Sequence, residues 1–179
     1  MSSDMATRLA DKFQYRAVPK GDYLLKEGKI SNHAHFLEDG FVRSYTFNTE
    51  GSEVTMGLFA APCVVNSLQS FFKRQPSREN LQALTDCTTW YITFDDLQTQ
   101  FHTIPEFREW GRLMLINSHA QLQDRVLGMI QNTAEERYAK LVQTQPAIFQ
   151  NVPLKMIASY LGVTDTSLSR IRKEFGKNK

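Results

Sequence analysis

The chain is poor in the residues that form metal and redox sites. Its two cysteines, Cys63 and Cys87, lack the CxxC spacing of a metal or redox pair. We expect both thiols to be reduced and buried, the usual state of cysteines in a cytoplasmic protein. The four histidines are scattered, and the close pair His33 and His35 has no third ligand in view. Structural zinc usually needs four ligands, so we expect no metal site.

Long apolar runs are also absent from the sequence. A membrane-spanning helix needs about 20 consecutive apolar residues, and no stretch approaches that length. The N-terminal text MSSDMATRLADKFQYR contains acidic residues and no continuous apolar region, unlike a signal peptide. With 41% hydrophobic and 22% charged residues, the composition is that of a globular protein. We expect a cytoplasmic protein without a membrane partner, with one medium domain and a smaller one.

The segment PLKMIASYLGVTDTSLSRIRKEF, residues 153–175, predicts two short helices joined by a tight turn. Ala158 is small where the second helix would cross the first, and Gly162 suits a left-handed turn. Either Thr164 or Asp165 can cap the second helix. Apolar residues at helical spacing would fill the core: Met156, Ile157, Leu161, Val163, Leu168 and Ile171. The pattern predicts a helix-turn-helix, although an ordinary helical hairpin would bury the same residues.

Charge favours a nucleic-acid partner for this segment. Residues 151–179 contain six basic and two acidic side chains, a net charge of +4. The whole chain carries +2, so the rest of it carries −2. A basic tail on a slightly acidic body is typical of binding to phosphates. The second helix would present to a DNA major groove the polar residues Thr166, Ser167, Ser169, Arg170 and Lys173.

Residues 22–94 contain short runs of β-forming residues separated by turns. The strand candidates are residues 23–25, 34–37, 41–47, 53–59 and 81–94. Many short strands at nearly even spacing predict an antiparallel sandwich or barrel. Helical spacing predicts a helix over 4–15, with Met5, Leu9 and Phe13 on one face. It also predicts a short helix within 64–75 and another that starts at Thr93.

A longer helix, from Pro105 to about Gln131, carries apolar residues in two stripes. The stripe with near-heptad spacing comprises Leu113, Ile116, Ala120, Leu127 and Ile130, and the other comprises Leu115, Leu122, Val126 and Met129. We expect one face to pack on the chain's own barrel and the other on a symmetry mate. The alternative is a helix buried wholly inside the monomer. Thr133 and Glu136 then form a capping-box pattern, so the linker falls at residues 130–134.

The order of these features resembles the Crp/Fnr family of bacterial transcription regulators. The matching text is Gly28, LEDGFVRSY, the turn at Gly51, AEERYAKL and IASYLGVTDTSLSRIRK. The resemblance covers essentially the whole chain and implies an α+β fold. Its parts would be an antiparallel jelly roll of cyclic-nucleotide-binding type, a dimerisation helix over about 106–131, and a helix-turn-helix without an evident β wing. We therefore expect a sensor domain over 1–131 and a DNA-binding domain over 132–179.

By this resemblance, the cyclic-nucleotide cassette is altered. Members that respond to cyclic AMP carry a Gly-Glu-Leu stretch for the ribose and an Arg-Ser pair for the phosphate. Here residues 64–84 contain no Gly-Glu, and the pair has become Ser77-Arg78. A polar ligand binds weakly without such partners, so we do not expect cyclic AMP to bind, and the effector stays unknown. Ser67, Ser70 and Arg78 are either surface residues of a vestigial cassette or parts of a retuned effector pocket.

The resemblance also bears on cofactors. The N-terminal cysteine cluster of the iron–sulfur members is absent, so we expect no iron–sulfur cluster. A haem would need an axial ligand, for which His33, His35 and Cys63 are available, but nothing selects one of them. An enzyme is not expected, because no nucleophile–base pair, metal set or phosphate loop stands out.

The expected function is a homodimeric transcription regulator bound to a near-palindromic site in double-stranded DNA, with RNA polymerase as a further partner. The candidate DNA-binding residues are Lys155, Thr164, Asp165, Thr166, Ser167, Ser169, Arg170 and Lys173. Among them, the family's base-contacting positions fall on Asp165, Thr166 and Arg170, and Lys155, Ser169 and Lys173 would contact phosphates. The alternative is a small-molecule sensor whose helix-turn-helix no longer reads DNA, which the missing wing and Asp165 would favour.

Overall fold

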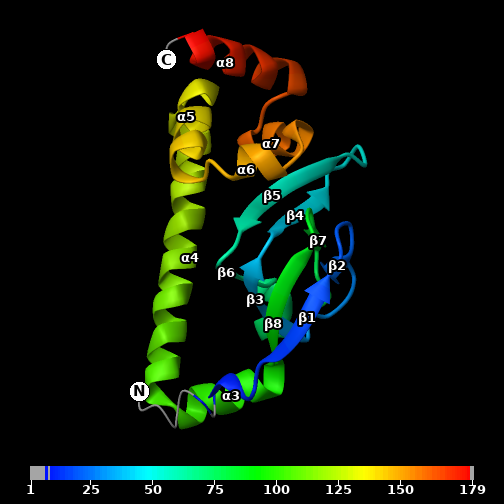
Figure 1. The fold of residues 1–179 in the computed structure, drawn as a ribbon, viewed down its shortest axis with the longest axis vertical. Helices are drawn as coiled ribbons and strands as arrows, with labels where there is room; N and C mark the ends of the chain where they lie inside the picture. Colours follow the sequence, from blue (N-terminus) through cyan, green and yellow to red (C-terminus); the bar gives the residue numbers. More distant parts are fainter. Residues whose placement is uncertain (1–6, 8, 178–179) are drawn as a thin grey trace.

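The protein contains a β-sandwich followed by a group of helices (Figure 1). The computed structural model describes residue 7 and residues 9–177. The described strands are β1 (Gln14–Val18), β2 (Tyr23–Leu25), β3 (His33–Asp39), β4 (Phe41–Phe47), β5 (Glu53–Ala60), β6 (Cys63–Val65), β7 (Asn80–Ala83) and β8 (Cys87–Thr93). The helices are α2 (Leu68–Lys73), α3 (Phe94–Thr103), α4 (Pro105–Gln131), α5 (Ala134–Thr144), α6 (Ile148–Asn151), α7 (Leu154–Leu161) and α8 (Asp165–Lys177).

The strands form two four-stranded antiparallel sheets, with the orders β1-β8-β3-β6 and β2-β7-β4-β5. Buried apolar side chains of both sheets meet in one core, among them Leu37 of β3 and Val42 of β4, which are both fully buried. Two antiparallel sheets packed in this way, followed by helices, give the α+β jelly-roll architecture that the sequence predicts. The predicted fold class is confirmed.

Two short strands escape the sequence prediction. Residues 14 and 15, which the periodicity assigns to a helix, belong to β1, because β1 pairs with β8 along its whole length. The predicted partners Leu9 and Phe13 do pack against a buried cluster that includes Phe71, whereas Met5 lies outside the described residues. The helix expected within 64–75 is shorter, because residues 63–65 pair with β3 as β6.

The remaining boundaries follow local signals. The predicted run 81–94 is two strands, β7 and β8, separated by a turn at residues 84–86. Thr93 caps α3, since its Oγ1 accepts a hydrogen bond from the N–H of Asp96 (3.2 Å). The capping box that precedes α5 is confirmed, because Thr133 and Glu136 each bond to the other's backbone N–H. The short helix α6 is not predicted from the sequence.

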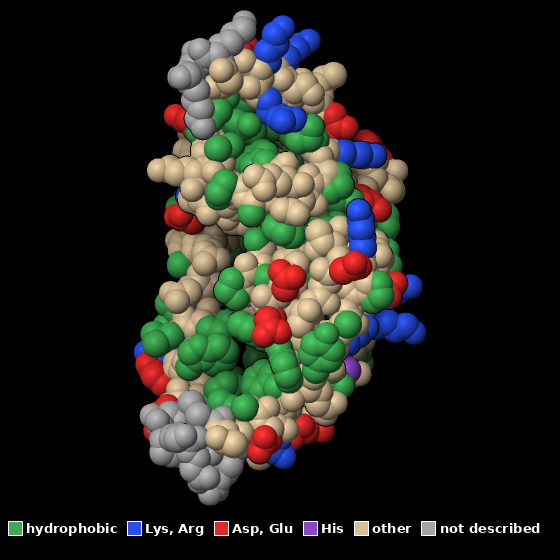
Figure 2. All heavy atoms as spheres, in the orientation of Figure 1, with side chains coloured by type: hydrophobic (Ala, Val, Ile, Leu, Met, Phe, Trp, Pro, Cys, Tyr) green, Lys and Arg blue, Asp and Glu red, His purple; other side chains and the backbone are tan. Residues whose placement is uncertain are grey.

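The long helix α4 is exposed along most of its length. Its buried residues, Phe107 and Gly111, lie in the first two turns, and Phe101 of α3 packs against them. Beyond them the large apolar side chains of both stripes are at least 41% exposed, and Ile130 is 76% exposed. Figure 2 shows hydrophobic side chains gathered around the lower half of this helix and on the adjoining barrel. No described helix is long and apolar enough to cross a membrane.

This exposure corrects one expectation from the sequence. The prediction that one apolar stripe of α4 packs on the chain's own barrel is wrong, and so is the alternative of a helix buried inside the monomer. The helix packs on α3 at its start and reaches β5 and α7 through Arg125 near its end. Between these points the described part of the chain leaves both stripes exposed, so the apolar residues of α4 are available to a partner.

Candidate DNA-binding surface and sensor cavity

Helices α7 and α8 form the helix-turn-helix that the sequence predicts. Gly162 ends α7 with a φ of 69°, and its N–H donates to the carbonyl of Ser159 (3.1 Å). This left-handed backbone is the conformation for which glycine was expected. The helices pack through residues that are at most 5% exposed: Ile157, Ala158, Leu161, Leu168 and Ile171.

Replacing Gly162 with alanine is expected to destabilise the helix-turn-helix by about 1–2 kcal/mol, because a Cβ is strained at positive φ. That Cβ would also press on the side-chain methyl of Met129 in α4. Gly176, in α8, is a matched control, since a Cβ there meets nothing within 4 Å. Gly176→Ala should leave stability unchanged or raise it by up to about 1 kcal/mol. Thermal unfolding measures both effects, and equal melting temperatures would contradict the prediction.

Thr164 caps α8. Its Oγ1 accepts a hydrogen bond from the N–H of Ser167 (3.2 Å) and lies within 3.0 Å of the hydroxyls of Thr166 and Ser167. The Ser169 hydroxyl donates to the carbonyl of Asp165 (2.9 Å), one turn earlier in the same helix. The capping residue is therefore Thr164, and several hydroxyls expected at DNA are held in contacts within α8 itself. A hydroxyl can still accept or donate a second bond.

The polar face of α8 is open to solvent. Thr166, Ser169, Arg170 and Lys173 are all exposed, as is Asp165 at the start of the helix. Within the described part of the chain, no hydrogen bond or ion pair engages the side chain of Arg170 or Lys173. Lys155, on α7, is also exposed. Figure 1 places α8 at the opposite end of the molecule from α3, so this face is accessible to a large partner.

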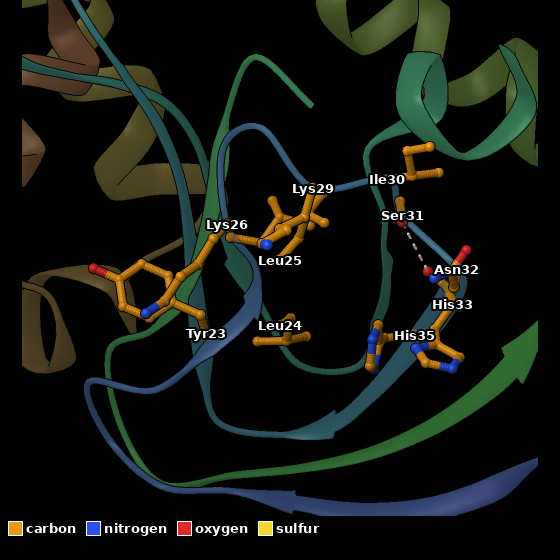
Figure 3. A pocket seen from close by; sticks show the side chains of 11 residues that line it. Tyr23, Leu24, Leu25, Lys26, Lys29, Ile30, Ser31, Asn32, His33 and His35 are labelled. Atoms are coloured by element: carbon orange, nitrogen blue, oxygen red, sulfur yellow. Dashed lines mark hydrogen bonds between the residues drawn. The ribbon is translucent and has the colours of Figure 1, made fainter. Parts of the chain in front are cut away.

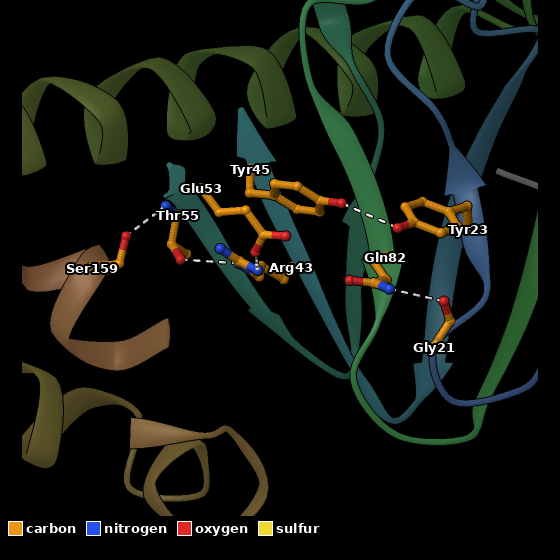
Figure 4. Close-up of polar contacts among 8 residues, drawn as sticks. All are labelled: Gly21, Tyr23, Arg43, Tyr45, Glu53, Thr55, Gln82 and Ser159. Atoms are coloured by element: carbon orange, nitrogen blue, oxygen red, sulfur yellow. Dashed lines mark hydrogen bonds and ion pairs between the residues drawn. The ribbon is translucent and has the colours of Figure 1, made fainter. Parts of the chain in front are cut away.

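The helix-turn-helix is docked on the barrel. Phe41 and Leu58, from β4 and β5, pack into the same apolar cluster as Ile157 and Leu161. The N–H of Thr55 in β5 donates to Oγ of Ser159 in α7 (2.9 Å; Figure 4). Both apolar packing and a backbone hydrogen bond therefore fix the position of α7 on β5.

Arg125 of α4 adds a second link to the same place. Its guanidinium donates to the carbonyl of Tyr160 in α7 (3.2 Å) and to the carbonyls of Thr55 and Met56 in β5. It also lies 4.4 Å from the centre of the Tyr160 ring, within the range of a cation–π contact. One side chain of the long helix thus holds both the barrel and the helix-turn-helix.

A buried arginine lies beside this contact. Arg43 of β4 has a side chain that is 2% exposed, and its Nε donates to Oγ1 of Thr55 (3.0 Å). Its Nη1 forms an ion pair with Glu53 (2.6 Å), and the guanidinium lies 4.3 Å from the ring centre of Tyr45. Burial and a hydrogen bond with Tyr23 raise the pKa of Tyr45. Figure 4 shows that this network runs from Tyr23 to α7, and sequence patterns did not identify it.

The candidate cassette residues do not converge on one site. Ser67 and Ser70 are buried, so the expectation that they are surface residues is wrong, whereas Arg78 is exposed. Ser70 Oγ accepts from the N–H of Ser31 (2.9 Å) and donates to the carbonyl of Gln75 (2.6 Å), which is a structural role. The sole carboxylate between Asn66 and Asn80 in the sequence is Glu79. Glu79 is half-buried and Arg78, next to it in the sequence, is exposed.

A cavity of about 280 Å³ lies between β2, the loop that follows it, and β3 (Figure 3). Lys26 and Lys29 are in its wall, together with Leu25 and the rings of His33 and His35. Burial, with a smaller contribution from the charge of Arg16, lowers the pKa of His33 and lowers that of His35 to about 3. These histidines are two of the residues that the sequence offers as metal or haem ligands. Their alternation with Leu37 on β3 is the signal that places all three on one face of the strand.

Comparison with known proteins supports this organisation. Residues 15–103 match the family model of the cyclic nucleotide-binding domain. Electron transport regulator A of Shewanella oneidensis is 25% identical over 174 residues, which cover 91% of this chain and 69% of that protein. The fumarate and nitrate reduction regulatory protein of Yersinia pestis is 26% identical with the same coverage.

Solved structures agree in fold. FixK2 from Bradyrhizobium japonicum has a TM-score of 0.79 at 16% identity, and the match covers 93% of this chain and 85% of that one. A CooA variant from Carboxydothermus hydrogenoformans has a TM-score of 0.73 at 21% identity, covering 95% and 79%. The cyclic nucleotide-binding domain and the two regulators similar over 91% of the chain define a class of transcription regulators. The chain belongs to the Crp/Fnr family of transcriptional regulators.

Proposed function

We propose that the protein regulates transcription in the cytoplasm as a homodimer bound to a near-palindromic DNA site. The observation that carries this proposal is the exposed polar face of α8, with Arg170 and Lys173 unpaired within the described residues. A helix of this kind can enter a major groove, where arginine bonds guanine and lysine neutralises phosphate. The net charge of +4 over residues 151–179 favours the same partner.

The exposed apolar residues of α4 support the dimer. Side chains such as Ile116 and Leu127 would lose contact with water if two copies of α4 packed side by side. A two-fold axis along this helix would place two copies of α8 on successive major grooves. We assign residues 1–131 to the sensor and dimerisation unit and residues 132–179 to the DNA-binding unit. RNA polymerase is the expected further partner. We propose that the protein is not an enzyme.

The sensor domain is proposed not to use cyclic AMP, since Ser70 is engaged in structural bonds and Arg78 faces solvent. The alternative function is a sensor that no longer reads DNA. The exposed carboxylate of Asp165 favours that alternative, because it would repel a phosphate backbone. A salt-dependent gel shift with random DNA separates the two functions.

We expect Arg170→Ala and Lys173→Ala to impair DNA binding in different ways. Arg170→Ala should cost about 1–3 kcal/mol and relax sequence preference at one position of each half-site. Lys173→Ala should weaken binding to all sequences alike. It should also reduce the slope of the logarithm of the binding constant against the logarithm of the salt concentration by about one ion. Selection from a randomised DNA library, followed by titrations at several salt concentrations, measures both effects.

Lys20→Ala is a suitable control, since Lys20 is an exposed residue between β1 and β2, outside both α4 and α8. This variant should bind DNA as the parent does. If both α8 variants lower affinity uniformly across the library, Arg170 is a phosphate contact and specificity lies with Thr166 and Ser167. If neither variant affects DNA binding, the proposed function is wrong and the sensor-only alternative replaces it.

A further inference from the structure

The cavity in the sensor domain lies beside the cassette region, because the N–H of Ser31 in its wall donates to Ser70 Oγ. Its lining includes Leu81 but none of the three candidate cassette residues, Ser67, Ser70 and Arg78. Its volume of about 280 Å³ is at the lower end of the range for small-molecule pockets. Its apolar part includes Leu25 and Leu81, and its polar part includes Lys29 and Asn32. The lining therefore suits a compact ligand with one apolar and one polar end.

His35 supplies a specific contact point in this cavity. The residue is 2% exposed, and no described protein group forms a hydrogen bond with its Nδ1. Figure 3 shows its ring beside that of His33, directed into the space under the loop that carries Ser31 and Asn32. Buried polar atoms nearly always have a partner, because an unsatisfied one is costly. A ligand in the cavity would provide the missing partner.

The charges around the cavity select the type of ligand. Lys26 and Lys29 line it, and no acidic residue among those the structure describes does. Among the described residues neither lysine forms a salt bridge, and Nζ of Lys26 rests 4.6 Å from the centre of the Tyr23 ring. Arg16 is close enough to lower the pKa of both histidines. Two lining lysines without a described lining carboxylate disfavour a metal cation and favour an anion.

We propose that this cavity binds a small organic anion, with a carboxylate or phosphate group at the polar end and an apolar portion at the other. The acidic group would lie between Lys29 and His35 Nδ1, and the apolar portion would contact Leu25 and Leu81. Only the interpretation of the ligand as an effector depends on the proposed function as a regulator with a sensor domain. Binding itself can be measured without DNA, so its failure and the failure of DNA binding are distinguishable.

The test is NMR of ¹⁵N-labelled histidine side chains in the full chain, titrated with benzoate, with inorganic phosphate and with neutral benzamide. The chain has four histidines, and His102 and His119 are exposed on α3 and α4, which makes them internal controls. Benzoate, phosphate or both should shift the His35 signal to saturation below about 10 mM, an affinity typical of a fragment. Benzamide should not, and the control histidines should stay unchanged. No His35 shift with either anion, or an equal shift with benzamide, overturns the proposal.

Charge variants provide a second test. The double variant Lys26→Gln with Lys29→Gln should weaken anion binding by about tenfold or more, because both side chains line the cavity. Lys20→Gln with Lys140→Gln removes the same charge from exposed positions that do not line it, and should change the affinity by less than about twofold. All four lysines are exposed, so the variants should fold. If both double variants weaken anion binding equally, the effect is one of long-range charge and the proposed site is wrong.

Discussion

Replacing both Ile116 and Ala120 with glutamate is expected to convert the protein to monomers and to lower its affinity for DNA by roughly 100-fold or more. Ile116 is 50% exposed in the single chain and Ala120 is also exposed, so the chain's own fold does not depend on either side chain. In a dimer both would be buried, and two carboxylates would have to lose their water without a partner. A monomer can contact only one half-site of the DNA, so it loses the gain in affinity that comes from binding two linked half-sites at once.

Light scattering gives the mass of the variant, and a gel shift gives its affinity. The matched control is Ser118→Glu with Gln121→Glu, which adds the same charge at exposed positions outside the near-heptad stripe. The control should remain dimeric and bind DNA. If the Ile116 and Ala120 variant stays dimeric with an intact fold, the interface lies elsewhere on the chain.

Truncating Leu168 is expected to destabilise the helix-turn-helix by about 2–5 kcal/mol. The side chain is 1% exposed and lies in the apolar cluster that joins α5, α7 and α8. Leu168→Ala removes buried apolar contacts and leaves a cavity between helices that are short and cannot easily close it. This loss is a large part of the stability of a small domain, so DNA binding should fail at temperatures where the barrel is still folded.

Thermal unfolding followed by circular dichroism, together with DNA binding at several temperatures, measures the effect. Ser169→Ala, at the next position, should change stability by less than about 0.5 kcal/mol, because that side chain is exposed. A similar melting temperature for the two variants would mean that Leu168 does not support the packing of α8.

The sequence contains enough local information for most of the helices. The helix-turn-helix follows from a small residue at Ala158, a glycine at Gly162 and apolar residues at helical spacing, all of which the structure uses as predicted. Threonines before α3 and α5 also specify where these helices start, through hydrogen bonds to N–H groups within three residues. Such signals are readable because both partners lie close together in the sequence.

Features that depend on distant pairing could not be predicted. Strand β6 has three residues and exists because it pairs with β3, about thirty positions away, and β1 depends on β8 in the same way. The apolar pattern of α4 shows how wide its apolar surface is, but it does not show whether the chain's own barrel or a second copy packs on that surface. Most of the residues expected at DNA are exposed on α8, whereas the cavity at His35 arises from a loop and a strand whose packing no local pattern encodes.

The position of Arg125 has a consequence for how a signal could move through the molecule. Successive residues of an α-helix are separated by about 100°, so Arg125 lies on the side of α4 opposite Ile116. The apolar stripe and the link to β5 and α7 therefore occupy opposite sides of one rigid rod. In the proposed dimer, a rotation of α4 by one residue would carry the Arg125 guanidinium about 100° from the three carbonyls that it holds. All three bonds would break together, and α7 would then be held on β5 only by its apolar packing and the hydrogen bond between Thr55 and Ser159.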